Sequence, residues 1–137
     1  MTYLTRVTAA AGALLSAAGL LAASPAHAAP RDDLPRNWLS LIVTRGDAPT
    51  RTTRGALLLC DPPQGHPRAA EACTELAAAD GDIARIPADN VLCPMIYAPV
   101  TAYARGQWNG RPVDFRQTYP NACVMNARTG AVFALDG

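Results

Sequence analysis

The sequence predicts an α+β fold, in which a five-stranded, mostly antiparallel sheet is accompanied by a clear α-helix. Three observations support this fold class. Short apolar, β-branched runs alternate with turn residues, one stretch has helical periodicity, and no repeat or internal domain boundary interrupts the chain. The length of 137 residues makes one domain the expected number.

The first two strands are expected soon after the start of the folded part. Residues 38–44 (WLSLIVT) are rich in large and β-branched side chains, and residues 46–49 (GDAP) supply a turn after them. Residues 55–60 (GALLLC) form a continuous apolar run, which favours a strand buried on both faces. We expect the two strands to pair as antiparallel neighbours.

A helix is expected over residues 68–79 (RAAEACTELAAA). The preceding segment, residues 61–67 (DPPQGHP), contains three prolines and cannot be regular structure. Within 68–79 the apolar side chains recur at steps of three and four residues, which places them on one stripe of a helix. Cys73 lies on that stripe and should face the sheet from which Cys60 emerges.

Three further strands are expected in the C-terminal half. Residues 99–104 and 113–119 are predicted to form strands. Between them we expect a turn at Arg105-Gly106 and a hairpin turn at Asn109-Gly110. Residues 131–135 (AVFAL) are expected to form the fifth strand.

The N-terminal 28 residues have the pattern of a secretory signal peptide. Arg6 precedes an apolar run over 7–23, and Ala26-His27-Ala28 provides a small-residue cleavage site. The run is short for a membrane anchor, and a proline follows it. We therefore expect an extracellular domain of residues 29–137, not bound to a membrane, whose proline-rich and charged residues 29–37 form a flexible arm.

Composition excludes several classes of function. The 12 basic residues are all arginine and are balanced by 11 acidic ones, so no basic face for nucleic acid is expected. After residue 28 the chain has a single serine, Ser40, and a single histidine, His66. No nucleophile motif surrounds Ser40, and a phosphate loop of the Walker type would need the missing lysine. We therefore expect neither an enzyme nor a cofactor.

Four cysteines, Cys60, Cys73, Cys93 and Cys123, follow the signal-like segment. An even number in a small exported chain indicates two disulfides, whereas the absence of a C-x-x-C pair argues against a metal site. Three pairings are open in principle. The pairing of nearest neighbours, the first two with each other and the last two with each other, is favoured because Cys73 should face the strand that ends at Cys60.

Residues 91–99 (VLCPMIYAP) place large apolar side chains where a loop is normally polar. A core strand is one explanation for this composition. Against it, Pro94 fixes its own φ angle and favours an extended Cys93, which a disulfide would tether to a distant segment. An apolar, extended and rigid segment at the surface is what a protease cleft binds, because such a segment loses little conformational entropy on binding.

Several spaced motifs resemble the Streptomyces subtilisin inhibitor family. Residues 60–67 (CDPPQGHP), followed by Ala72-Cys73-Thr74-x-Leu76, resemble its signature, and residues 93–97 (CPMIY) resemble its reactive loop. Residues 107–110 (QWNG), 121–127 (NACVMNA) and 132–134 (VFA) also match family positions. The resemblance implies a five-stranded antiparallel sheet with two helices on one side, the second near 122–127. It also implies the same disulfide pairing and a secreted homodimer.

The resemblance further implies a serine protease inhibitor that acts by the standard mechanism on the bond Met95-Ile96. An unbranched apolar Met95 would suit the primary specificity pockets of subtilisin-like and chymotrypsin-like proteases. Asn121 would support the loop from below, although a turn role beside Pro120 is an equal alternative. The remaining protease-binding residues would be Val91, Leu92, Cys93, Pro94 and Tyr97.

Two other functions stay open on the sequence alone. The protein could inhibit a secreted metalloprotease or another protease of the producing cell, with Met95 merely exposed. It could also be a secreted interaction domain that has kept the scaffold without inhibitory use.

Overall fold

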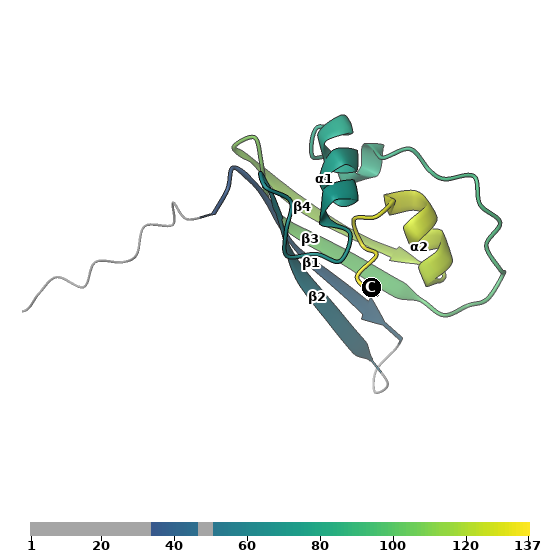
Figure 1. Cartoon of the computed structure of the whole chain (residues 1–137). Coiled ribbons are helices and arrows are strands. Elements are labelled where there is room, and N and C mark those ends of the chain that lie inside the picture. The colour runs from purple at the N-terminus through teal and green to yellow at the C-terminus, as the bar shows by residue number, and fades with distance from the viewer. Residues whose placement is uncertain (1–33, 47–50) are drawn as a thin grey trace, which may run out of the picture.

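The computed structural model describes residues 34–46 and 51–137 (Figure 1). The predicted signal peptide of residues 1–28 and residues 29–33 of the predicted arm lie outside this part. The elements in chain order are β1 (Asn37–Arg45), β2 (Thr52–Cys60), α1 (Ala69–Ala78), the short 3-10 helix η2 (Ile83–Arg85), β3 (Val100–Trp108), β4 (Arg111–Tyr119) and α2 (Ala122–Thr129).

The strands form one antiparallel sheet in the order β2-β1-β3-β4. Strand β1 alternates strictly: Leu39, Leu41 and Val43 are buried, whereas Ser40 and Ile42 point to the opposite face and are exposed. Both α-helices cover the buried face (Figure 1). The core therefore lies in a single layer between the sheet and the helices.

The prediction of a fifth strand is wrong for the described residues. Residues 131–135 form a turn and irregular chain, held by backbone bonds such as Val132 N–H to Thr129 O and Ala134 N–H to Ala131 O. Val132 and Phe133 are at most 1% exposed. The run is apolar because it fills the core after α2, and a short apolar run has the same composition whether or not it pairs with a strand.

The sequence also misplaced a turn and the burial of β2. Arg105-Gly106 lies inside β3, where a Cβ on Gly106 would come 2.1 Å from the carbonyl oxygen of Trp38 in the neighbouring strand. Gly106 thus marks a close approach of two backbones. Strand β2 is an edge strand and leaves Leu57 43% exposed, so it is not buried on both faces.

Other predicted elements are confirmed. The predicted helix over 68–79 is α1, whose buried residues Ala72, Cys73 and Leu76 lie on one stripe. The hairpin turn falls at Asn109-Gly110, and both residues have positive φ angles. The second helix, which only the resemblance implied, is α2.

Two disulfides have the predicted pairing, one between a strand and a helix and one between a loop and a helix. Cys60 at the end of β2 is bonded to Cys73 of α1, and Cys93 is bonded to Cys123 in α2. No cysteine is left free. Each disulfide of this kind adds about 2–4 kcal/mol to the stability of a small domain.

No helix of residues 34–46 and 51–137 is both long and apolar enough to cross a membrane.

His66 connects the segment before α1 to the C-terminal segment. Its side chain is 9% exposed, its Nε2 atom lies 3.0 Å from the carbonyl oxygen of Val132, and its Nδ1 accepts the backbone N–H of Arg68 at 2.9 Å. Nε2 therefore carries the proton of a neutral ring. Burial lowers the pKa of His66 below 6.5, and the nearby Arg68 charge lowers it further, against the opposing effect of the Val132 hydrogen bond.

This environment predicts that the free energy of unfolding of residues 29–137 decreases as the pH falls below 6.5. The histidine of the unfolded chain takes up a proton near pH 6.5, whereas that of the folded protein does so only at a lower pH. The contribution of His66 to stability is therefore complete above pH 6.5 and is lost as the pH falls through the pKa of the folded state. Urea unfolding at pH 7.5, 6.0 and 5.0 measures the effect. The His66→Gln variant serves as the control and should show a flatter dependence; equal slopes would assign the effect to other groups.

Candidate functional site

The most unusual surface feature is the loop of residues 87–99 between η2 and β3. It contains no helix or strand and swings outward beyond α2 (Figure 1). Large apolar side chains in it stand free of the protein: Leu92 and Met95 are each 103% exposed, and Tyr97 is 80% exposed. Val91 and Ile96 are also exposed. The predicted protease-binding residues therefore lie together on one protruding segment, and the core-strand alternative is wrong.

Backbone hydrogen bonds hold both ends of this loop. The N–H of Asp89 donates to the carbonyl of Ala127 in α2 at 2.7 Å, and the N–H of Ala98 donates to the carbonyl of Pro120 at 2.8 Å. At the entrance to β3, the N–H of Gly46 donates to Pro99 O at 3.1 Å. The loop is thus fixed to α2 and to the end of β1.

The Cys93-Cys123 disulfide holds the middle of the loop. Cys123 lies in the first turn of α2, and the two Cα atoms are 5.7 Å apart. Pro94 follows directly and fixes its own backbone φ angle. The chain is therefore constrained covalently two residues before Met95.

Asn121 supports the loop from below. Its side chain is 7% exposed, and its Nδ2 donates to the carbonyl oxygens of Pro94 at 3.1 Å and Ile96 at 3.0 Å. Its Oδ1 accepts the N–H of Val124 at 2.9 Å and so caps α2. One side chain therefore bonds a carbonyl on each side of the Met95-Ile96 peptide bond while the helix fixes its orientation.

The contacts described for the loop are one disulfide, three backbone hydrogen bonds and the two bonds donated by Asn121. A hollow of about 330 Å³ lies against it, lined by loop residues and by Pro120, Asn121 and Val124. The rigidity of the loop consequently depends on a small number of hydrogen bonds and one disulfide.

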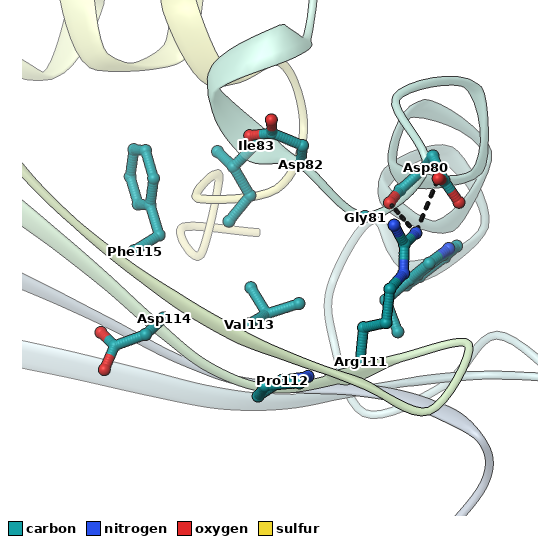
Figure 2. Close-up of a pocket in the computed structure, with 10 residues that line it drawn as sticks. Asp80, Gly81, Asp82, Ile83, Arg111, Pro112, Val113, Asp114 and Phe115 are labelled. Carbon is teal, nitrogen blue, oxygen red and sulfur yellow. Dashed lines mark hydrogen bonds and ion pairs between the residues drawn. The ribbon is translucent and has the colours of Figure 1, made fainter.

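A second hollow, of about 260 Å³, lies at the other end of β3, next to Trp108 (Figure 2). Figure 2 shows Arg111 reaching Asp80, to which it is joined by an ion pair of 2.6 Å and by a hydrogen bond to the carbonyl at 3.1 Å. Arg111, the single basic residue of this lining, is therefore already paired with one of its three carboxylates. No cluster of three metal-ligating side chains occurs among the residues that the structure describes.

Ser40 and His66 do not form a catalytic pair. Ser40 lies on the exposed face of the sheet, away from the helices, whereas both ring nitrogens of His66 are bonded to backbone groups on the helix side. A histidine in this state has no free nitrogen to act as a general base.

Sequence reasoning did not find Pro120, Ala127 or Gly46, which contact the loop through backbone groups. Backbone donors and acceptors are present at almost every residue, so the sequence does not show which of them contact the loop. The position of Pro120 next to Asn121 was the one available signal.

Comparison with known proteins gives a consistent family assignment. The family model described as "Subtilisin inhibitor-like" matches residues 36–121, a range that includes the whole loop and Asn121. A Streptomyces avermitilis protein with the name "Putative serine protease inhibitor" is 59% identical over 124 residues, covering 90% of this chain and 84% of the relative. The subtilisin inhibitor of Streptomyces albogriseolus is 40% identical over 102 residues, covering 69% and 71%.

A similar solved structure is that of Streptomyces caespitosus sermetstatin in complex with Bacillus licheniformis subtilisin. Its TM-score is 0.52 at 34% sequence identity, and the match covers 72% of this chain and 99% of sermetstatin.

Proposed function

Because the chain belongs to the subtilisin inhibitor-like family, we propose that it inhibits subtilisin-like serine proteases with its protruding loop. The observation that carries the proposal is the exposed Met95-Ile96 bond, whose neighbouring carbonyls are held by Asn121. Sermetstatin, which is similar in sequence and fold, forms a complex with a subtilisin. The named relatives are inhibitors, in agreement with the expectation that this chain is not an enzyme.

The proposed mechanism is substrate-like binding. The serine of the protease approaches the carbonyl carbon of Met95, and cleavage would release the amine of Ile96. That amine stays in place, because Asn121 holds the Ile96 carbonyl and Pro120 holds Ala98. It can therefore re-form the peptide bond faster than water hydrolyses the acyl-enzyme, and the protease remains occupied.

In this mechanism Met95 occupies the primary specificity pocket, as the P1 residue, and Ile96 is P1′. The flexible, unbranched Met95 side chain suits a broad apolar pocket of the subtilisin or chymotrypsin kind. It offers no positive charge to the acidic pocket of trypsin. Leu92, Cys93, Pro94 and Tyr97 would occupy the P4, P3, P2 and P2′ positions.

Titration of three proteases tests the function. Purified residues 29–137 should inhibit subtilisin at one loop per active site, inhibit chymotrypsin more weakly and leave trypsin active. Full subtilisin activity at a tenfold excess would refute the proposal. In that case a secreted metalloprotease is titrated as a fourth enzyme. Its inhibition would favour a metalloprotease inhibitor, and no inhibition of any of the four would favour an interaction domain.

The Met95→Lys variant is expected to transfer inhibition from subtilisin to trypsin. A lysine ammonium pairs with the carboxylate of the trypsin pocket, whereas in an apolar pocket it must be desolvated without a partner. Residual-activity assays with both proteases measure the change, which should be about 100-fold or more in the ratio of inhibition constants. The control is Ala78→Lys, which adds the same charge to an exposed position of α1. Equal selectivity of the two variants would refute Met95 as the P1 residue.

We propose that the protein is exported and cleaved after Ala28. The signal-like pattern of residues 1–28 supports this, and the two disulfides fit an oxidising compartment. N-terminal sequencing of the protein from the culture medium of an expressing host tests it. An intact residue 1 on intracellular protein would contradict export.

We also propose a homodimer, formed by the sheet face that the helices leave uncovered. Ile42 is 39% exposed and Leu57 is 43% exposed on this face. A second copy would shield these side chains from water. Analytical ultracentrifugation should give a dimer for the wild type and a monomer for Leu57→Asp; a wild-type monomer at micromolar concentration would refute the dimer.

A further inference from the structure

The sulfur atoms of the described chain differ sharply in their accessibility. All four cysteine sulfurs are in disulfides. Met125 lies in α2 with 1% of its surface exposed, whereas Met95 is 103% exposed. Within residues 34–46 and 51–137, Met95 therefore carries the one thioether that a dissolved oxidant reaches freely.

We propose that Met95 is a site of reversible oxidation, and that its conversion to methionine sulfoxide by hydrogen peroxide switches off protease inhibition. In this step a lone pair of the Met95 sulfur attacks one peroxide oxygen and the O–O bond breaks. The sulfur gains a single oxygen and loses two electrons, while the peroxide is reduced to one molecule of water. No bond of the polypeptide is broken. The inference rests on the proposed function, in which Met95 enters the protease.

Oxidation would act on binding through the polarity of this one side chain. The sulfoxide is a strong hydrogen-bond acceptor, and an apolar specificity pocket has no donor to satisfy it. Burying an unsatisfied polar group of this kind weakens binding roughly 10- to 100-fold.

The fold should not change on oxidation, because nothing in the protein packs around the Met95 side chain. The loop is held through the backbone carbonyls of Pro94 and Ile96 and through the Cys93-Cys123 disulfide. The same exposure leaves the sulfoxide accessible to a methionine sulfoxide reductase. Met125, at which oxidation would disrupt the core, is protected by its burial.

The experiment compares inhibition before and after oxidation. Residues 29–137 are treated with hydrogen peroxide, catalase removes the oxidant, and the product is titrated against subtilisin. Peptide mass spectrometry should locate one added oxygen on Met95 and none on Met125, circular dichroism should be unchanged, and inhibition should weaken roughly 10- to 100-fold. A methionine sulfoxide reductase supplied with a dithiol reductant should restore it, because the dithiol gives two electrons to the sulfoxide, is oxidised to a disulfide, and the oxygen leaves as water. Unoxidised inhibitor treated identically is the reference and shows whether the reductant affects the protein's own disulfides.

Two matched variants test whether oxidation of Met95 causes the loss of inhibition. Met125→Leu should lose inhibition on peroxide treatment as the wild type does, whereas Met95→Leu should keep whatever inhibition it has before treatment. Met95 sulfoxide with full inhibition, no oxidation at Met95, or loss in treated Met95→Leu would each overturn the inference. Failure of the untreated wild type to inhibit would instead refute the proposed function itself.

Discussion

Replacement of Met95 by aspartate is expected to abolish inhibition of subtilisin while leaving the protein folded. The Met95 side chain is fully exposed, so no contact of the fold depends on it. In the complex, a carboxylate would have to enter an apolar pocket without a partner. An unpaired buried charge costs about 3–5 kcal/mol, which corresponds to a loss of roughly 100- to 1,000-fold or more in affinity.

Inhibition titrations and thermal unfolding of the same preparation measure this prediction. Ala70→Asp is the matched control, because it places the same charge at an exposed position near the start of α1, where a negative charge is tolerated. The control should inhibit as the wild type does. Tight inhibition by Met95→Asp would mean that another surface binds the protease, whereas a large fall in its melting temperature would show that Met95 has a structural role.

Replacement of Asn121 by aspartate is expected to turn the inhibitor into a substrate. The aspartate keeps one oxygen for the N–H of Val124 and so preserves the cap of α2. Its other oxygen replaces the Nδ2 donor and faces the carbonyl oxygens of Pro94 and Ile96. Two hydrogen bonds are lost and repulsion takes their place, which should weaken inhibition about 10- to 100-fold.

The distinguishing measurement is cleavage of the inhibitor over time. Incubation with a small amount of subtilisin, followed by mass spectrometry, should show rapid cleavage after Met95 in Asn121→Asp and slow cleavage in the wild type. Asn126→Ala, at an exposed position of the same helix, is the control and should behave as the wild type. If Asn121→Asp resists cleavage as well as the control does, the loop does not depend on these hydrogen bonds.

Two of the elements that the sequence predicted correctly, β1 and α1, have a distinct local period. Strand β1 alternates between buried and exposed residues, and α1 shows its apolar stripe, so both are visible without a structure. The run 131–135 (AVFAL) is apolar at every position and therefore has no period to distinguish a strand from irregular core chain. Gly106 has the composition of a turn, yet its role depends on the backbone of β1, which is distant in sequence.

The sequence predicted the exposed side of the candidate site more completely than the side that supports the loop. The solvent side, from Val91 to Tyr97, was visible because exposed apolar residues beside prolines are unusual. The supporting side was visible only at Asn121 and Cys123, since the remaining contacts use backbone groups of Pro120, Ala127 and Gly46. The sequence left loop support and a turn role beside Pro120 as alternatives for Asn121, whereas in the structure its amide both supports the loop and caps α2.

The position of the Met95-Ile96 bond divides the sheet into two hairpins. The chain before the bond supplies β2 and β1, and the chain after it supplies β3, β4 and α2. The central ladder, from Trp38 opposite Gln107 to Arg45 opposite Val100, and the Cys93-Cys123 disulfide both cross this division. A molecule cleaved at Met95-Ile96 would therefore persist as a two-chain protein, held together by the β1-β3 ladder and the disulfide. Its fragments would separate only when it is both unfolded and reduced.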